Sequence, residues 1–165
     1  MNTLGWQSLE VLRANLDWEE LQVRSAQAGV GFIRHMHDRN GPLFERWYAE
    51  HRSCTEEKQR MLRQFEQYKV FTSSSVGNHD FAELQKKHPG ISTTKEHLEF
   101  ELLKLAQREE ECLRATRAAD RLDRSRDPTE EQRLRASILR ACQAFDTQHE
   151  RCVELLEQFR RNYLD

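Results

Sequence analysis

The stretch FERWYAEHRSCTEEKQRMLRQFEQY, residues 44–68, decides the predicted fold of this chain. Eight of its residues follow one another at alternating spacings of three and four: Phe44, Trp47, His51, Cys54, Lys58, Met61, Phe65 and Tyr68. That period places a mainly apolar stripe along one side of an α-helix, while Glu, Arg, Gln and Lys fill most other positions. The stripe therefore predicts a long helix buried against other helices.

The rest of the chain repeats this pattern. We expect four helices over approximately residues 3–39, 42–71, 93–125 and 128–163, with a loop at 72–92 that is rich in Ser, Gly and Pro. The predicted stripe of the third helix is Leu98, Leu102, Leu105, Cys112, Ala115, Ala119 and Leu122. That of the fourth helix is Leu134, Ile138, Ala141, Phe145, Cys152, Leu155 and Phe159.

Local signals mark the helix boundaries. Asn40-Gly41-Pro42 ends the first helix and opens the second, because proline suits a first helical turn and not a helix interior. Thr93 and Glu96 have the spacing of a capping box at the start of the third helix. Asp127-Pro128 predicts the cap and first residue of the fourth helix.

Two glycines, Gly29 and Gly31, lie inside the first predicted helix. Each weakens a helix by about 1 kcal/mol relative to alanine. They predict either a close approach of another helix or a bend.

The predicted fold class is all-α, an elongated antiparallel four-helix bundle or pair of coiled-coil hairpins, formed by one domain over residues 1–165. Short connections after the first and third helices make each an antiparallel hairpin with its successor. The two hairpins either close into one bundle or stay open and complete their core by dimerising. The sequence leaves both arrangements open.

Composition excludes several function classes. The chain has 165 residues, of which 26 are Lys or Arg and 28 are Asp or Glu, and the two signs are interspersed. A nucleic-acid-binding surface requires clustered positive charge, so no nucleic-acid partner is expected. No stretch approaches the roughly 20 apolar residues of a membrane span, and the first residues do not resemble a secretory signal. We expect a cytoplasmic protein whose four scattered cysteines serve as core residues.

Two HxxC pairs, His51 with Cys54 and His149 with Cys152, suggest a metal hypothesis. Residues three apart share a helix face, and the four side chains would supply a tetrahedral zinc site. However, aligned parallel helices would place the pairs about 20 Å apart at 1.5 Å per residue. Core packing is the favoured interpretation, and no metal, other cofactor or catalytic set is expected.

Two further sets of residues are candidates for contact with a partner. Arginines at spacings of three, four and three share one face of the third helix: Arg114, Arg117, Arg121 and Arg124. Such a row suits an acidic protein or anionic headgroups, or is simply a solvated face. Trp18 and Tyr48 are large residues outside the stripes, and they suggest a second contact surface or a wider core.

These observations favour a non-enzymatic helical scaffold or adaptor that binds other proteins, with homodimerisation as a further option. The alternative is membrane association. Gly41-Pro42-Leu43-Phe44 at the start of the second helix and Asp127-Pro128 before the last one resemble features of the BAR and F-BAR superfamily over about residues 26–160. That resemblance implies a membrane-associating dimer, although the chain lacks the concentrated Lys and Arg that such domains place against lipid.

Overall fold

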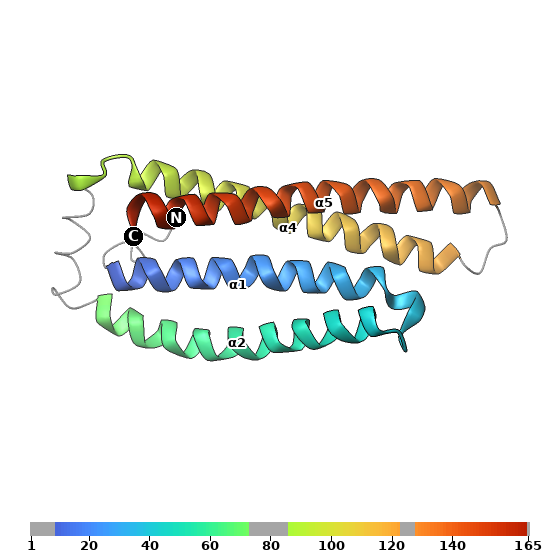
Figure 1. The fold of residues 1–165 in the computed structure, drawn as a ribbon, viewed down its shortest axis with the longest axis horizontal. Helices are drawn as coiled ribbons and strands as arrows, with labels where there is room; N and C mark the ends of the chain where they lie inside the picture. Colours follow the sequence, from blue (N-terminus) through green and yellow to red (C-terminus); the bar gives the residue numbers. More distant parts are fainter. Residues whose placement is uncertain (1–8, 73–85, 123–127, 165) are drawn as a thin grey trace.

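The computed structural model describes residues 9–72, 86–122 and 128–164, and within these ranges the regular elements are helices (Figure 1). They are α1 (Leu9–Arg34), the short 3₁₀ helix η2 (Met36–Asp38), α2 (Pro42–Thr72), α4 (Ile91–Leu122) and α5 (Pro128–Tyr163). The all-α class and the elongated antiparallel bundle are confirmed.

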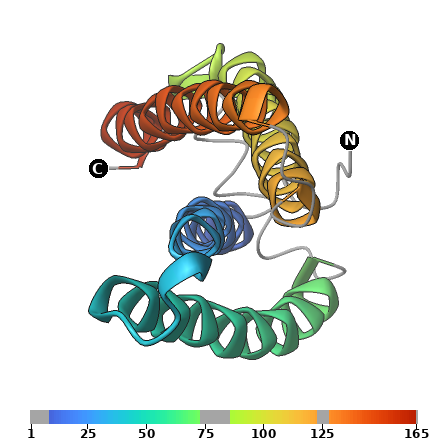
Figure 2. The same ribbon diagram turned by 90° about the vertical axis from the view of Figure 1, so that its right-hand side faces the viewer.

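The bundle consists of two antiparallel hairpins that α1 joins. α1 pairs with α2 in one hairpin, α4 pairs with α5 in the other, and α1 also packs against both α4 and α5. Viewed from the end, α1 lies between α2 and the α4/α5 pair (Figure 2). The arrangement is therefore a three-helix bundle of α1, α4 and α5, with α2 covering the remaining side of α1.

The main hydrophobic core lies among α1, α4 and α5. Its buried members are Leu12, Leu16, Val23, Ala26, Val30, Ile91, Leu98, Leu105, Cys112, Cys142, Phe145, Cys152, Leu156 and Phe159. Most of them recur at spacings of three and four, as amphipathic helices require. Leu156 lies outside the predicted stripe of the fourth helix, and it is nevertheless 2% exposed. It is buried because α5 faces two helices and so needs a wider apolar side.

A second, thinner layer lies between α1 and α2. Leu21 and Ala28 of α1 and Cys54 of α2 are buried, yet they stand outside the main core. The predicted stripe of the second helix is otherwise half-exposed in this layer, at Phe44, Trp47, His51, Lys58 and Met61. The side chains of Phe65 and Tyr68 lie outside the described part. The expectation of a fully buried stripe is thus corrected, because α2 has essentially one neighbouring helix.

Gly31 explains how α2 approaches α1 so closely. A Cβ atom at this position would lie 2.6 Å from Cδ2 of Trp47, whose ring occupies that space. A Cβ atom on Gly29 would meet only ordinary contacts with His51, the nearest at 3.6 Å. α1 is continuous through both residues. Of the two predicted roles, close approach is therefore the one that the structure shows.

Some predicted boundaries were wrong. The first helix ends at Arg34 and is followed by η2, so it is shorter than expected. The predicted capping box of Thr93 and Glu96 does not start α4, which begins two residues earlier at Ile91. The carbonyl of Gly90 instead accepts hydrogen bonds from the backbone N–H and the hydroxyl of Thr94. Asp127 lies outside the described residues.

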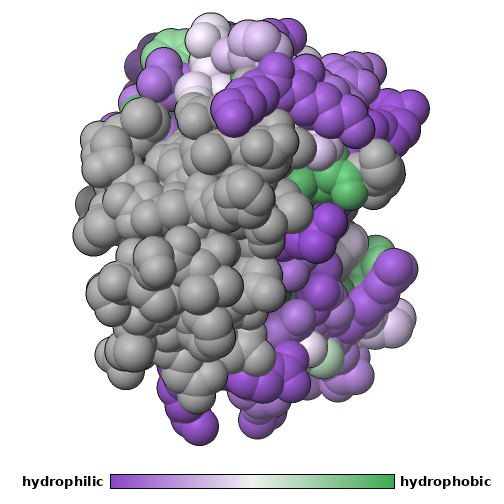
Figure 3. All heavy atoms as spheres, turned by 90° about the vertical axis from the view of Figure 1, so that its left-hand side faces the viewer, coloured by the Kyte–Doolittle hydropathy of each residue, from purple (hydrophilic) through white to green (hydrophobic). Residues whose placement is uncertain are grey.

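Polar side chains cover most of the described surface in Figure 3, and hydrophobic ones form small separate patches. In the described ranges, no helix combines the length and the hydrophobicity that crossing a membrane requires.

Candidate partner-binding groove

A groove runs between α1 and α4 and encloses about 490 Å³. We call it the α1/α4 groove. Its apolar lining includes Val23 and Ala26 of α1 and Leu105 and Ala106 of α4. Three of these side chains are short, so they do not fill the space between the two helices. Trp18, one of the residues predicted to contact a partner, also lines the groove and is half-buried.

Large apolar side chains continue outward from the groove along α4. Leu103 lines the groove and is 58% exposed, and Phe100, one helical turn earlier, is 55% exposed. Nζ of Lys104 lies 4.8 Å from the centre of the Phe100 ring, a cation–π contact that covers part of it. The groove therefore has an apolar rim as well as an apolar floor.

An ion cluster joins the two helices beside the groove. Lys95 of α4 is completely buried, and its Nζ lies 2.5 Å from Oε1 of Glu19 and 3.2 Å from Oε1 of Glu99. Burial raises the pKa of Glu19, whereas the positive charge of Lys95 opposes that rise. Among the described residues, Oε2 of Glu19 is buried without a hydrogen-bond partner. Leaving a buried acceptor without a hydrogen bond in this way costs free energy.

Among the residues that the structure describes, the charged ones that line the groove are glutamates: Glu19, Glu99 and Glu109. Burial raises the pKa of Glu109, and the charge of Lys58 on α2 opposes the rise. The buried ammonium group of Lys95 neutralises part of the negative charge of Glu19 and Glu99. The groove thus presents an apolar surface with net negative charge.

Sequence reasoning identified Trp18 but missed Glu19 and Lys95 as a pair. The signal was present, because Glu19 falls in the apolar stripe of α1 and Lys95 falls in register with Leu98 and Leu105. Opposite charges inside two stripes indicate helices that face each other. Only the relative rotation and stagger of the helices brings the two groups into contact.

The arginine row is only partly described. Arg114 and Arg117 are exposed on α4, and a guanidinium nitrogen of Arg114 lies 3.8 Å from Oε1 of Glu110. The side chain of Arg121 and all of Arg124 lie outside the described part. The two visible arginines are compatible with the solvated face that was the alternative interpretation.

Tyr48 belongs to an aromatic cluster between α1 and α2. It stacks on Phe44 with ring centres 5.8 Å apart, and Phe32 of α1 meets both rings edge-on. His51 also contacts Phe32, with ring centres 5.1 Å apart. Although Tyr48 is 45% exposed, these contacts show that one of its faces packs within the hairpin.

The four residues of the zinc hypothesis are not assembled. His51 and Cys54 pack on the α1 side of α2, while His149 lies against Phe145 on α5. The thiol of Cys152 donates to the carbonyl of Glu101, and burial raises its pKa to about 11. In the part of the chain that the structure describes, no three His, Cys, Asp or Glu residues are grouped to hold a metal ion.

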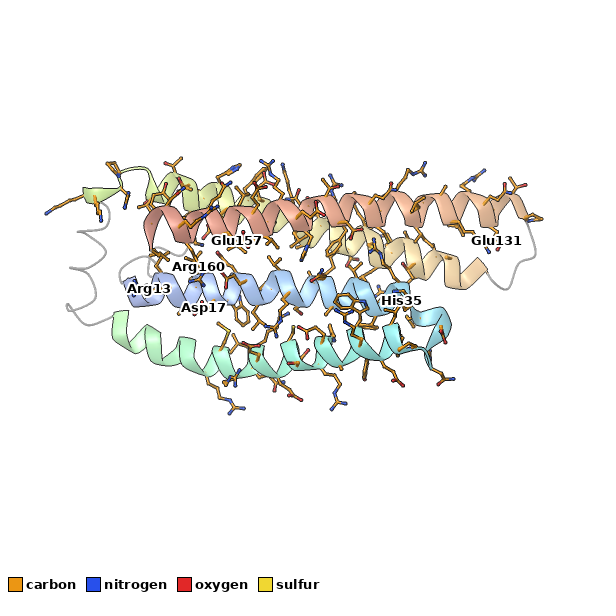
Figure 4. The ribbon with its side chains drawn as sticks, viewed as in Figure 1. Arg13, Asp17, His35, Glu131, Glu157 and Arg160 are labelled. Carbon is orange, nitrogen blue, oxygen red and sulfur yellow. The ribbon has the colours of Figure 1, made fainter. Side chains whose placement is uncertain are left out.

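Ion pairs at both ends of α1 hold it against α5. Near the start of α1, Arg160 of α5 lies between the two helices and pairs with Asp17 and Glu20 (Figure 4). Near its end, Arg34 pairs with Asp146 of α5 at 2.9 Å. These partly exposed pairs contribute little stability, about 0–1 kcal/mol each, but they orient α1.

Protein-family models, curated proteins and solved structures were compared with this chain, and none of them matches.

Proposed function

We propose that this protein is a non-catalytic helical scaffold or adaptor, and that the α1/α4 groove binds an amphipathic helix of another protein. The partner helix would carry an apolar stripe flanked by Lys or Arg. The single observation that supports this proposal most is the combination of an apolar groove with a lining whose charged residues are all acidic.

The dimensions of the groove suit such a partner. Its lining spans residues 15–26 of α1 and 99–109 of α4, which correspond to about 15–17 Å of helix axis. About three turns of a partner helix would lie along it. The partner helix would then bury the exposed side chains of Phe100 and Leu103. These two residues are one helical turn apart, which is the spacing of apolar anchors in helix-in-groove recognition.

Charge decides the kind of partner that we propose. Lys and Arg on the partner helix would face Glu99 and Glu109, which are half-buried in the lining of the groove. An acidic partner helix would be repelled, because complementary charge favours one partner over another at interfaces of this kind.

The test uses a synthetic 18-residue peptide with a leucine stripe flanked by lysines, and a matched peptide with glutamates in place of the lysines. Trp6→Phe and Trp47→Phe in the protein leave Trp18 as the only tryptophan. We expect the lysine peptide to shift the Trp18 emission to shorter wavelength and the glutamate peptide to leave it unchanged.

Two substitutions of equal exposure provide the control. Leu103→Ser should weaken binding at least tenfold, since it removes an apolar anchor from the rim without changing the charge of the groove. Leu139→Ser, at a leucine on α5 that is 59% exposed, should leave binding unchanged. Equal effects of the two variants, or equal binding of the two peptides, would contradict the proposal.

Two further measurements identify other occupants. If light scattering shows a dimer that Leu103→Ser dissociates, the groove binds a second copy of the chain. If the protein co-sediments with anionic phosphatidylserine vesicles and Arg117→Glu abolishes this, membrane association replaces the proposal. We expect neither result.

A further inference from the structure

Two cysteines from neighbouring helices lie in contact inside the main core. Sγ of Cys112 on α4 is 3.1 Å from Sγ of Cys142 on α5, and the two residues are 0% and 5% exposed. Both are free thiols. A disulfide bond is about 2.05 Å long, so a movement of about 1 Å would bring the two sulfur atoms to bonding distance.

The positively charged side chain of Arg34, on α1, lies near this pair of cysteines. The guanidinium of Arg34 pairs with Asp146 at 2.9 Å, its positive charge acts on Cys142, and the Arg34 side chain is 32% exposed. Asp146 follows Cys142 by one turn of α5, so Arg34 lies at the edge of the core on the same part of that helix. Cys112 from α4, Arg34 from α1 and Asp146 from α5 are the titratable groups that act on Cys142.

These neighbours make the two thiols different. The pKa of Cys142 is lowered, first because the thiol of Cys112 donates a hydrogen bond to its sulfur and then because Arg34 lies close to it. The pKa of Cys112 is raised by its contact with the Cys142 sulfur and by burial. Thiolates are the reactive form of cysteine, so Cys142 is the nucleophile of the pair.

Burial dominates at the other two cysteines, although the positive charge of Arg24 opposes the rise in the pKa of Cys54. Cys54 donates to a carboxylate oxygen of Glu50, and Cys152 donates to the carbonyl of Glu101. Burial raises the pKa of both thiols. The contrast singles out Cys112 and Cys142 among the four.

We propose that Cys112 and Cys142 are a site of reversible oxidation, at which hydrogen peroxide converts the two thiols into a disulfide that joins α4 to α5. The Cys142 thiolate attacks one peroxide oxygen, the O–O bond breaks, and hydroxide leaves to take up the proton that Cys142 released. Cys142 is then a sulfenic acid. The Cys112 sulfur attacks the Cys142 sulfur, the S–O bond breaks, and water leaves with the Cys112 proton. The two thiols lose two electrons, and one peroxide becomes two waters.

The sequence makes the product easy to identify. Trypsin places each cysteine in its own peptide, 53–58, 109–114, 141–151 and 152–160. The folded chain is treated with hydrogen peroxide, blocked with N-ethylmaleimide and digested. We expect a cross-linked pair of peptides 109–114 and 141–151 as the main product, removed by dithiothreitol. Cross-links that involve the other cysteines instead, or free thiols at Cys112 and Cys142, would overturn the proposal.

Two variants test the order of the steps. Cys112→Ala removes the attacking thiol, so Cys142 should accumulate as a sulfenic acid that dimedone labels. Cys142→Ala should leave Cys112 unlabelled. Labelling of Cys112 in that variant would contradict the assignment of the nucleophile.

The role of Arg34 is tested against another arginine of α1. Arg34→Gln should slow disulfide formation by about three- to tenfold, because it lowers the thiolate fraction of Cys142. Arg24→Gln is the matched control, since Arg24 lies beside Cys54 and pairs with Glu50. It should leave the rate unchanged, and equal slowing by both variants would refute the role of Arg34.

The thermal midpoint reports whether the bond fits the native fold. The disulfide would close a loop of 30 residues and should raise Tm by about 5–10 °C. A lower Tm after oxidation would show that the bond requires a distorted structure, and would overturn the inference.

Discussion

Helix α1 is buried on two sides, and the two sides are packed to different depths. Toward α4 and α5 it contributes Leu12, Leu16 and Val30 to a core in which these side chains are no more than 1% exposed. Toward α2 it meets a stripe in which Cys54 is buried, while Trp47 and Met61 are half-exposed. Both stripes have the same period in the sequence. The number of neighbouring helices, and not the period, determines how deeply a stripe is buried.

Few side chains are buried between α1 and α2, and the two helices are held together mainly by a close approach of their backbones and by aromatic contacts. The Trp47 ring occupies the space above Gly31, and Phe32 packs edge-on against two rings of α2. The α4/α5 side relies instead on aliphatic, phenylalanine and cysteine side chains, and it includes the buried pair of Lys95 and Glu19.

Removing one phenylalanine from each side should give the largest difference. Phe145 of the main core is 1% exposed, so Phe145→Ala should reduce the free energy of unfolding by about 3–5 kcal/mol. Phe44 is half-exposed in the α1/α2 layer, and Phe44→Ala should cost only about 1 kcal/mol. Urea unfolding followed by circular dichroism measures both, and equal losses would show that the two layers are equally tight.

The two glycines of α1 should respond in opposite directions. Gly31→Ala would place Cβ against the Trp47 ring, an overpacking cost of about 1–3 kcal/mol that exceeds the gain of about 1 kcal/mol in helix propensity. Gly29→Ala meets only ordinary contacts and should stabilise by up to about 1 kcal/mol. Thermal unfolding of the two variants checks the signs. Stabilisation by Gly31→Ala would mean that α2 moves away from α1 at little cost.

The smallest effect concerns the dependence of stability on pH. The α1/α2 layer and the α1/α4/α5 bundle each contain one histidine whose pKa is lowered by burial. His51 lies in the α1/α2 layer, and His149 lines a cavity of about 450 Å³ on α5. Burial lowers the pKa of both below 6.5. Below that pH the unfolded chain binds protons that the folded chain does not, so stability is lost as pH falls from 6.5 through the folded pKa values.

Asparagine at either position should therefore reduce the loss of stability in acid. His51→Asn and His149→Asn are each expected to flatten the dependence of the free energy of unfolding on pH between about 6.5 and 5. Their effects should add, because the two residues lie in different layers. Urea unfolding at several pH values measures the slopes, and a wild-type slope in both variants would contradict the prediction.

Local features of the fold were predictable from sequence. The helix order, the short turn at Asn40-Gly41-Pro42 and the start of α5 at Pro128 follow from periodicity and from the backbone limits of Gly and Pro. The start of α4 was missed because Thr93 and Glu96 fit a capping box, whereas burial of Ile91 extends the helix backward by two residues. Tertiary packing overrode a local signal there.

The candidate site was only partly predictable. Trp18 was identified from its size and position, but the acidic lining of the groove and the contact of Cys112 with Cys142 were not. The arginine row and Tyr48 were chosen from spacing and size alone. Spacing along one helix says which residues share a face, and it contains no information on what lies opposite.

Long amphipathic helices in antiparallel hairpins follow from the sequence, since turns and helix periods depend on residues close together in the chain. The packing of the helices in three dimensions was needed to place α1 in both layers, to bring Lys95 to Glu19, and to bring two sulfur atoms together between α4 and α5. These contacts depend on the rotation and axial stagger of each helix. Those quantities result from the packing of all the side chains together, and no single stretch of sequence specifies them.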